Sequence, residues 1–425
     1  QAEWTAPLYY SEHIQNTDHF YTASKYEYQN SIETWGFEGR GPIGYLVTQI
    51  ANNRPQGHFA GVGMAVGNFT LPSFTDLALK GVGPQLSFVR YYDSYSAGTS
   101  LGKGWSFNFD AYLVEDASSG IHIAWGDGSE SHFDGTLAPY PGYFEEVDKI
   151  DDGINYGYDI VTKDQTVYQF RRLSLTTPGP DILLIKITDK HGNTLSLSRQ
   201  ASHGLVVSAT DASGRVFDYE YSPVLLADGR TVQRLTKVTD TSLTPNRTVN
   251  LAYDTRGNLA SITDARGNTT QYTYNDDGYL NGIIYPEGNN VTITYNDLGQ
   301  VAGYTNGTIN LSFDFQAGAA GTTVRSGATA LANYVPDTQY RADTINLPDG
   351  TDIKPVYLAG NLLNLPGAVK DQQGNLSYFG YDNNGNLLRA ENPLNETITY
   401  TYDQWNNLTS VTDQRNNTTV YSYDP

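Results

Sequence analysis

The side chains best suited to chemistry in this sequence are its seven histidines and its adjacent acidic pairs. No histidine lies in a His-Glu-x-x-His motif or at a spacing typical of zinc ligands, and we single out only His19, which lies between Asp18 and Phe20. A lone histidine commonly completes a hydrogen-bond pattern, so we interpret His19 as structural. Asp151-Asp152 and Asp276-Asp277 would point to opposite faces of a strand, which does not suit paired acid-base catalysis. We expect both pairs to be solvated turn residues.

Motifs for nucleotides, phosphates and metals are incomplete. Gly61-x-Gly63 lacks the third glycine of a dinucleotide fingerprint, and the sequence has no P-loop and no Gly-x-Ser-x-Gly elbow. Asp382-Asn-Asn-Gly385 begins like a calcium loop but lacks the glutamate that ends one. Cysteine is absent, which excludes disulfides, thiol catalysis and thiolate-bound metals. The sequence therefore predicts no catalytic residue, no metal site and no cofactor, and we expect a protein that is not an enzyme.

Composition restricts both the partners and the fold class. A net charge of -20 does not suit nucleic acid or an anionic membrane surface, because phosphate binding requires clustered lysine and arginine. No apolar run approaches the roughly 18 residues of a membrane-spanning helix, so we expect no membrane insertion. With 42 glycines and 33 tyrosines, the chain favours short strands joined by tight turns. We expect an all-β protein.

One phrase, Tyr-Asp/Asn-x-x-Gly/Asn, recurs at a spacing of 21 residues. It starts at Tyr253, Tyr274 and Tyr295 in a first block and at Tyr381, Tyr402 and Tyr423 in a second block. Its glycines are Gly257, Gly278, Gly299 and Gly385. A fixed period of this length is the signature of a repeat architecture in which each copy is one supersecondary unit. These tyrosines and glycines are therefore candidate structural positions of a repeat.

Each repeat contains a second turn midway between the tyrosines. It is found at residues 264–268, 286–289, 371–375 and 413–417. An aspartate that can accept from the backbone two residues on, followed by Gly or Asn where a positive φ is needed, favours a tight reversal with a bulge. Between the turns, stretches such as residues 396–402 alternate with the period of a strand. The repeat unit is therefore predicted to be a β-hairpin.

Tandem hairpins of this kind should build one continuous antiparallel sheet. Alternation places Tyr272 with Tyr274, and Tyr400 with Tyr402, on one face, which would stack tyrosines along the sheet. Open twisted sheets rarely exceed about ten strands without curling or splitting. We therefore expect the array over residues 180–425 to wind into a spiral or shell-like wall.

These repeats resemble the YD repeats of bacterial Rhs proteins, of insecticidal toxin-complex cocoon subunits and of animal teneurins. The resemblance is specific for residues 250–300 and 370–425 and looser for 180–250, where only the turns match. Residues 301–360 are irregular and glycine- and alanine-rich, and we expect a crossing loop that interrupts the sheet there. Asp424-Pro425 continues the repeat, and the self-cleavage element that closes longer Rhs shells is not present. The resemblance therefore implies a wall and carries over neither protease nor toxin activity.

The region from 60 to 178 is similar to the opening β domain of Rhs proteins. Its alternating segment, residues 86–94, and its Gly102-x-Gly104-Trp105 turn read as strands closed by glycine turns. We expect Trp105 to anchor a core or cap.

Residues 1–50 form a small module of different composition. They resemble an aromatic module of secreted bacterial and fungal proteins that is suspected of binding glycans, with candidate contacts at Tyr9, Tyr10, His19, Tyr21 and Trp35. The alternative is that the aromatic residues simply form the mini-core that so small a unit needs.

The sequence leads to two functional hypotheses. In the first, the chain is a non-catalytic extracellular wall or casing that encloses a toxin or plug, with a C-terminal segment beyond residue 425 as its partner. In the second, copies of the chain join through their sheet edges into a fibre or adhesin, and the N-terminal module contacts carbohydrate. A weaker third hypothesis is a sugar-binding accessory to an enzyme. The start at Gln1 predicts a processed or truncated chain, and we expect secretion or display at the cell surface.

Overall fold

A computed structural model describes residues 5–13, 19–22, 37–47, 58–116, 120–176, 180–316, 321–338, 340–371 and 373–423, with side chains from residue 60 onward. Within these ranges the secondary structure is β apart from one 3-10 turn, η2 (Gly360–Leu362). The all-β prediction is confirmed. The described residues contain no helix long and apolar enough to cross a membrane.

The N-terminal residues form a three-stranded sheet with the order β2-β1-β3. Its strands are β1 (Thr5–His13), β2 (His19–Thr22) and β3 (Phe37–Val47). The register places Tyr10 opposite Tyr21 and Glu12 opposite His19. The backbone of four of the five candidate glycan contacts is therefore in this sheet, and Trp35 lies outside the described residues.

A second small sheet, which we call the inner sheet, consists of β6 (Thr70–Ala78), β7 (Ser87–Asp93) and β8 (Trp105–Phe107). It is preceded by the short pair β4 (His58–Phe59) and β5 (Val62–Gly63). Strand β7 alternates as the sequence predicted, and Gly102 and Gly104 adopt φ values of 99° and 78° in the turn that leads into Trp105. Positive φ is accessible to glycine at little cost, which explains why the turn uses this residue.

The remaining strands form one long antiparallel sheet, the wall. Its first strands are β9 (Tyr112–Asp116), β10 (Gly120–Ala124), β11 (Glu130–Phe133), β12 (Glu146–Asp151), β13 (Tyr156–Val161), β14 (Val167–Arg172), β15 (Ile182–Thr188), β16 (Thr194–Arg199), β17 (Val206–Thr210), β18 (Val216–Leu225) and β19 (Thr231–Asp240). The repeats follow as β20 (Arg247–Tyr253), β21 (Leu259–Thr263), β22 (Thr269–Tyr274), β23 (Leu280–Ile284), β24 (Asn290–Tyr295), β25 (Val301–Thr305), β26 (Asn310–Phe315), β27 (Thr322–Ser326) and β28 (Thr329–Pro336). The last strands are β29 (Ala342–Asn346), β30 (Asp352–Tyr357), β31 (Pro366–Lys370), β32 (Leu376–Tyr381), β33 (Leu387–Glu391), β34 (Thr397–Tyr402), β35 (Leu408–Thr412) and β36 (Thr418–Val420).

The hairpin turns follow the predicted chemistry. At the turn between β20 and β21, Asp254 Oδ1 accepts from the backbone N–H groups of Arg256 and Asn258, both at 2.8 Å. Gly257 has φ 79°, and the register shifts by a bulge at Tyr253. Asn406 has φ 63° at the corresponding place in the turn after β34, because asparagine tolerates the left-handed region better than most residues. The prediction of a bulged hairpin as the repeat unit is confirmed.

Strand pairing continues through the region that the sequence marked as irregular. Antiparallel pairs link each strand from β24 to β30, so the expected crossing loop at residues 301–360 is wrong. The period changes there, but alternating segments such as residues 310–315 still provide the backbone donors and acceptors that a ladder needs. The weakest link is between β29 and β30, where only two residue pairs are in register.

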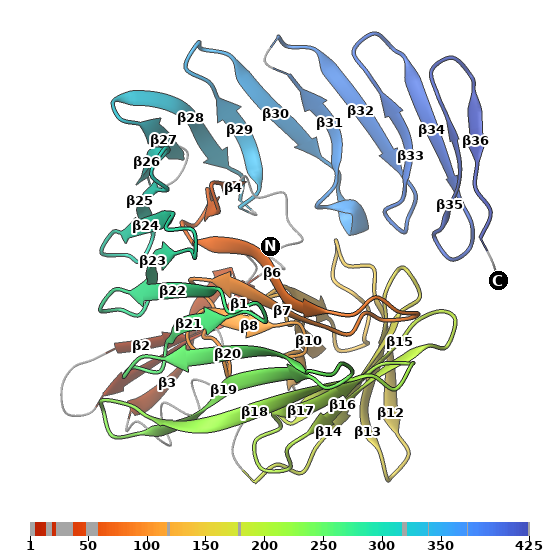
Figure 1. The fold of residues 1–425 in the computed structure, drawn as a ribbon. Coiled ribbons are helices and arrows are strands. Elements are labelled where there is room, and N and C mark those ends of the chain that lie inside the picture. Colours follow the sequence, from red (N-terminus) through yellow and green to blue (C-terminus); the bar gives the residue numbers. More distant parts are fainter. Residues whose placement is uncertain are drawn as a thin grey trace.

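The wall curls around the inner sheet, and β30 to β36 run outward as an open row of hairpins (Figure 1). Strand β9 pairs with both β10 and β15, which fixes the start of the curl. Farther along, turns of the last hairpins meet turns of the first ones. Gly142 N donates to Asn361 O at 3.0 Å, and Asn406 Nδ2 donates to Lys163 O at 3.1 Å. We call this line of turn-to-turn contacts the seam.

Candidate functional site

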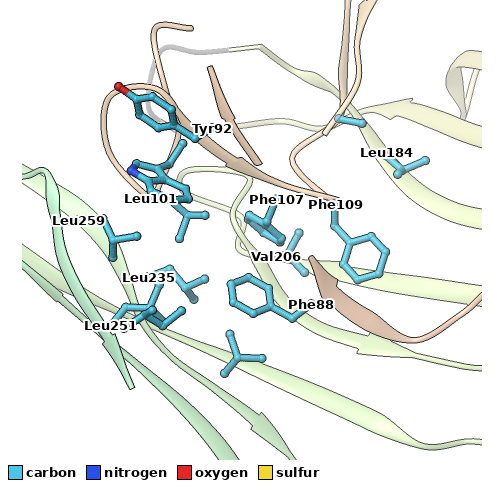
Figure 2. Packing of buried hydrophobic residues seen from close by; sticks show 14 of the residues in the cluster. Phe88, Tyr92, Leu101, Phe107, Phe109, Leu184, Val206, Leu235, Leu251 and Leu259 are labelled. Carbon is cyan, nitrogen blue, oxygen red and sulfur yellow. The ribbon is translucent and has the colours of Figure 1, made fainter. Parts of the chain in front are cut away.

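The inner face of the wall, which packs against the inner sheet, is the candidate functional surface of the molecule. One apolar cluster joins the inner sheet to the inward side chains of the wall. Figure 2 shows Phe88 and Phe107 of the inner sheet between Leu235 and Leu251 of the wall on one side and Phe109 and Leu184 on the other. Burial of apolar area at about 25 cal/mol per Å² makes this contact the main source of cohesion between the two sheets.

Trp105 occupies the centre of this contact. It is fully buried, its indole N–H donates to Tyr274 Oη at 2.8 Å, and its ring lies 5.0 Å from that of Tyr272. The expectation that Trp105 anchors a core is confirmed. Two tyrosines of the first repeat block therefore face inward together, as alternation predicted.

A buried ion pair lies beside Trp105. The Arg90 guanidinium, 2% exposed, pairs with the carboxylate of Asp76, and its Nη1 donates to Tyr272 Oη at 3.3 Å. Burial acts to lower the pKa of Arg90, but interactions with Tyr272 and Asp76 outweigh burial and raise it. Arg90 also lies 5.1 Å from the ring centroid of Trp105. Sequence analysis missed this pair, although an arginine inside the alternating apolar segment of β7 was a visible signal.

Hydroxyl groups of the repeat tyrosines form hydrogen bonds to neighbouring strands of the wall. Tyr274 Oη donates to Leu259 O and Tyr295 Oη donates to Leu280 O, each at 2.8 Å. The same bond, over the same 15 residues, joins Tyr423 to Leu408 at 2.8 Å. A buried tyrosine hydroxyl needs a partner, and the carbonyl at the start of the preceding strand provides it. This hydrogen bond explains why the repeat uses tyrosine at this position. Phenylalanine has no hydroxyl and could not form it.

The inner sheet and the turn that precedes it also accept from donors of the bulged wall strands. Leu280 N–H donates to Tyr92 Oη at 2.9 Å, and Val301 N–H donates to Gly67 O at 2.9 Å. Both donors stand opposite the bulges at Tyr274 and Tyr295, where the ladder is disrupted. The inner sheet therefore completes the hydrogen bonding of the wall in addition to filling its apolar face.

Close packing between the inner sheet and the wall predicts that alanine substitution costs more stability at one glycine than at another of similar φ. Gly102, φ 99°, lies where an added Cβ would meet Gly257 O at 2.8 Å, whereas Gly267, φ 88°, has open space. We expect Gly267→Ala to cost about 1–2 kcal/mol, from backbone strain alone. Gly102→Ala should cost about 1–3 kcal/mol more, because the wall backbone must shift. Urea unfolding of the two variants checks this, and equal losses would contradict it.

Asp110, which follows strand β8, is a second polar group beside the inner sheet. Asp110 Oδ2 accepts from Phe107 N–H at 3.3 Å, and removal of its carboxyl from solvent raises its pKa to about 7 against the opposing effects of Thr99 and Arg199. Arg199 connects this region to the wall, since its Nη2 donates to Phe109 O at 2.8 Å.

The raised pKa of Asp110 predicts a definite pH dependence. The folded state binds this proton more tightly than the unfolded chain, so the associated stability is complete below about pH 4 and is lost as pH rises through about 7. We expect Asp110→Asn, which cannot ionise, to gain stability relative to the parent protein between pH 5 and pH 8. Urea midpoints of both proteins at the two pH values test this, and a constant difference would contradict it.

The residues considered for catalysis take structural places. Asp152 Oδ1 accepts from the N–H of Ile154 in a turn, and Asp276 pairs with Arg256 at the surface. Asp152, Asp276 and Asp277 therefore lie in turns, as expected, whereas Asp151 ends strand β12. Among the described residues no group of three or more His, Asp or Glu side chains is placed to hold a metal ion. His122 and His132, which sequence analysis did not single out, stack at 5.7 Å on neighbouring strands.

Family models match three parts of the chain. A family described as RHS repeat matches residues 253–290 and 381–418, which are the two blocks with the 21-residue period. These two blocks therefore resemble RHS repeats. A family described only as a domain of unknown function, DUF6531, matches residues 60–133, which include the inner sheet. The matched repeats lie in the wall, from the end of β20 to the start of β24 and from the end of β32 to the start of β36.

Solved structures with similar folds include parts of toxin complexes. The crystal structure of TcdB2-TccC3-TEV is 14% identical over 68% of this chain and 19% of its own, with a TM-score of 0.36. A Photorhabdus luminescens Tc holotoxin pore with a variant TccC3 is 12% identical over 79% of this chain and 26% of its own, with a TM-score of 0.36. The chain thus spans a fifth to a quarter of these proteins. The search of curated proteins found no match.

Proposed function

We propose that this chain is a non-catalytic, secreted wall segment of an RHS-type casing, and that the inner face of its last strands covers an enclosed polypeptide such as a toxin or plug. The proposal rests on one observation: equivalent inward positions of the repeat are buried where the inner sheet covers them and only half-buried where it does not.

The contrast is clear at the start of matched strands. Leu259 and Leu280 are fully buried against the inner sheet, whereas Leu387 and Leu408, at the same repeat position, are half-buried. Inward positions from β32 to the residues after β36 include Ser377 and Thr419. The other half-buried or exposed residues there are aromatic or aliphatic: Phe379, Tyr381, Leu387, Ala390, Ile398, Tyr400, Tyr402, Leu408, Val411, Tyr421 and Tyr423. A contiguous apolar face of this kind typically marks an interaction site. A polypeptide suits it, because the same face of β20 to β25 already holds strands of this chain.

Photo-crosslinking from the inner face tests the casing. Benzoylphenylalanine in place of Tyr400, in the natural protein, should form adducts with a peptide outside residues 1–425. The same group in place of the outward-facing, exposed Thr399 is the matched control and should form few. Adducts confined to neighbouring wall strands at both positions would contradict enclosure.

The fibre hypothesis is favoured by a different observation, the exposure of the last strand. All three residues of β36 are exposed, and Val420 is 74% exposed. An exposed edge strand offers unpaired backbone groups to another chain. Filaments that lengthen with protein concentration under negative stain would support edge pairing, and particles of constant size would count against it.

The N-terminal sheet is proposed to contact carbohydrate. The register of β1 and β2 places Tyr10 and Tyr21 directly opposite each other, as a two-residue aromatic site would require. Glycan-array binding by the natural protein that is lost in the Tyr10→Ala variant would support this role. Uniformly blank arrays would exclude it.

A further inference from the structure

Three Asn-Gly pairs occur in the sequence, beginning at Asn281, Asn306 and Asn384. Such a pair can lose the side-chain amide without an enzyme, because the glycine nitrogen can attack the asparagine Cγ and close a five-membered ring. Asparagine is for this reason a thermolabile residue. Glycine permits the reaction, since it has no Cβ to crowd the ring and reaches backbone angles that other residues avoid. In a folded protein, the local structure decides which pair reacts.

The pair at Asn281 is held within a strand. Gly282 stands opposite Thr273 of β22 on one side and Thr292 of β24 on the other. Thr273 Oγ1 also donates to Asn281 Oδ1 at 2.8 Å. A strand that is paired along both edges keeps its backbone extended, so closing the ring would require the ladder to open.

The pair at Asn384 is held by hydrogen bonds to both of its reacting nitrogens. Gly385 N–H donates to Asp382 O at 3.1 Å, as glycines of the regular repeat turns do. Asn384 Nδ2 donates to Asn406 Oδ1 at 3.1 Å. The nitrogen that would attack and the amide that would leave are therefore both bound in the folded protein.

The pair at Asn306 lies in a different kind of turn. Asn306 N–H donates to Ile309 O, which closes a four-residue turn between β25 and β26, one residue shorter than the turn from Asp254 to Asn258. Gly307 is therefore second in its turn, where it is exposed, has φ 88° and has open space around it. Among the residues that the structure describes, neither Gly307 N–H nor Asn306 Nδ2 has an acceptor.

The amide oxygen of Asn306, in contrast, is bound. Asn306 Oδ1 accepts from Ile309 N–H at 2.9 Å and from Thr308 Oγ1 at 3.2 Å. Negative charge develops on this oxygen when the glycine nitrogen adds to Cγ, and donors that already point at it stabilise that charge. The turn thus binds the atom that becomes an anion and leaves both reacting nitrogens unbound.

A second four-residue turn shows that the product fits the fold. It runs from Asp152 to Asn155, with an aspartate where the first turn has Asn306 and with Gly153 next, at φ 79°. Asp152 Oδ1 accepts from Ile154 N–H at 2.9 Å. Hydrogen bonds from Asn155 and Ile154 lower the pKa of Asp152 to about 2, because they favour the charged form. An aspartate at position 306 should therefore leave its hairpin folded.

We propose that Asn306 is a self-modifying site, which its turn activates for loss of the side-chain amide. Gly307 N gives its proton to solvent and bonds to Asn306 Cγ, the Cγ–Nδ2 bond breaks, and Nδ2 leaves as ammonia with a proton from water. Water then opens the ring at either carbonyl, which gives aspartate or isoaspartate. Overall, one amide and one water become one carboxylate and one ammonium ion. The reaction adds a negative charge to the turn and does not depend on whether the wall encloses a polypeptide.

Incubation of the natural protein at mildly alkaline pH, followed by peptide mapping with mass spectrometry, measures the rate at each pair. In the folded protein, we expect Asn306 to react about tenfold faster than Asn281 and Asn384, because only its turn stabilises the charged oxygen. In urea the three pairs should react at similar rates, since the same dipeptide is then free at each place. Labelling by an isoaspartate methyltransferase should appear in the peptide that contains position 306.

Thr308→Val removes one donor to the amide oxygen and keeps the shape of the side chain. It should slow the reaction at Asn306 about threefold and leave Asn281 and Asn384 unchanged. Thr351→Val is the matched control, because Thr351 Oγ1 donates to Asp349 Oδ1 at 2.6 Å in a turn without an Asn-Gly pair. It should leave the rate at Asn306 unchanged.

Three outcomes would overturn the proposal. They are an unmodified Asn306, equal rates at the three pairs in the folded protein, and the same preference for Asn306 in urea as in native buffer. A Thr308→Val variant that reacts as fast as the parent would contradict activation by the turn. Circular dichroism melts of the two variants show whether each is folded, so that a changed rate reports the turn and not unfolding.

Discussion

Trp105→Ala should lower the free energy of unfolding by about 3–5 kcal/mol, the usual cost of truncating a large buried aromatic side chain. The loss combines the apolar cavity at the centre of the inner contact with the lost hydrogen bond from the indole N–H to Tyr274 Oη, at 2.8 Å. Urea unfolding followed by far-UV circular dichroism measures it. Because the change uncouples the inner sheet from the wall, strands β20 to β25 should become protease-sensitive first.

The matched control is Trp405→Ala, which removes the same side chain from a half-exposed turn. Surface changes of this kind usually stay within about 0.5 kcal/mol. Similar losses in the two variants would mean that the inner sheet does not hold the wall together.

Arg90→Met should cost about 3–5 kcal/mol, because it leaves the carboxylate of Asp76, 11% exposed, without its partner. The double variant Arg90→Met with Asp76→Leu should recover most of that loss, since well-packed apolar residues often replace a buried ion pair without penalty. Urea midpoints of the single and double variants measure the coupling.

The exposed pair of Arg256 and Asp276, 50% and 99% exposed, provides the comparison. Arg256→Met should leave the urea midpoint nearly unchanged, because solvent screens such pairs. A double variant no more stable than Arg90→Met would show that the arginine acts through its ring contacts and not through its charge.

Hairpin structure was predictable because it depends on neighbours in the chain. The aspartate, the glycine four residues after the tyrosine and the alternating strands act within about ten residues, and each performs locally as expected. Trp105 was also predictable, because a tryptophan after a glycine turn next to an alternating strand has few other uses. The irregular spacing after residue 300 led to the wrong prediction of a crossing loop, because a change of repeat period was interpreted as a loss of strand pairing. Backbone groups pair whatever the spacing of the side chains.

The arrangement of the chain in space could not be read in this way. Residues 60–110 and the repeats look like successive units along the chain, yet Phe69 packs 6.2 Å from Tyr304 and Lys103 lies over the ring of Tyr279. Likewise the seam brings Asn406 to Lys163, and no short-range pattern predicts that these two residues meet. Local propensities specify the β-hairpin unit and which of its side chains share a face. How far a twisted sheet curls, what its concave face covers and which turns then meet depend on the accumulated twist of many strands and on burial between segments distant in sequence.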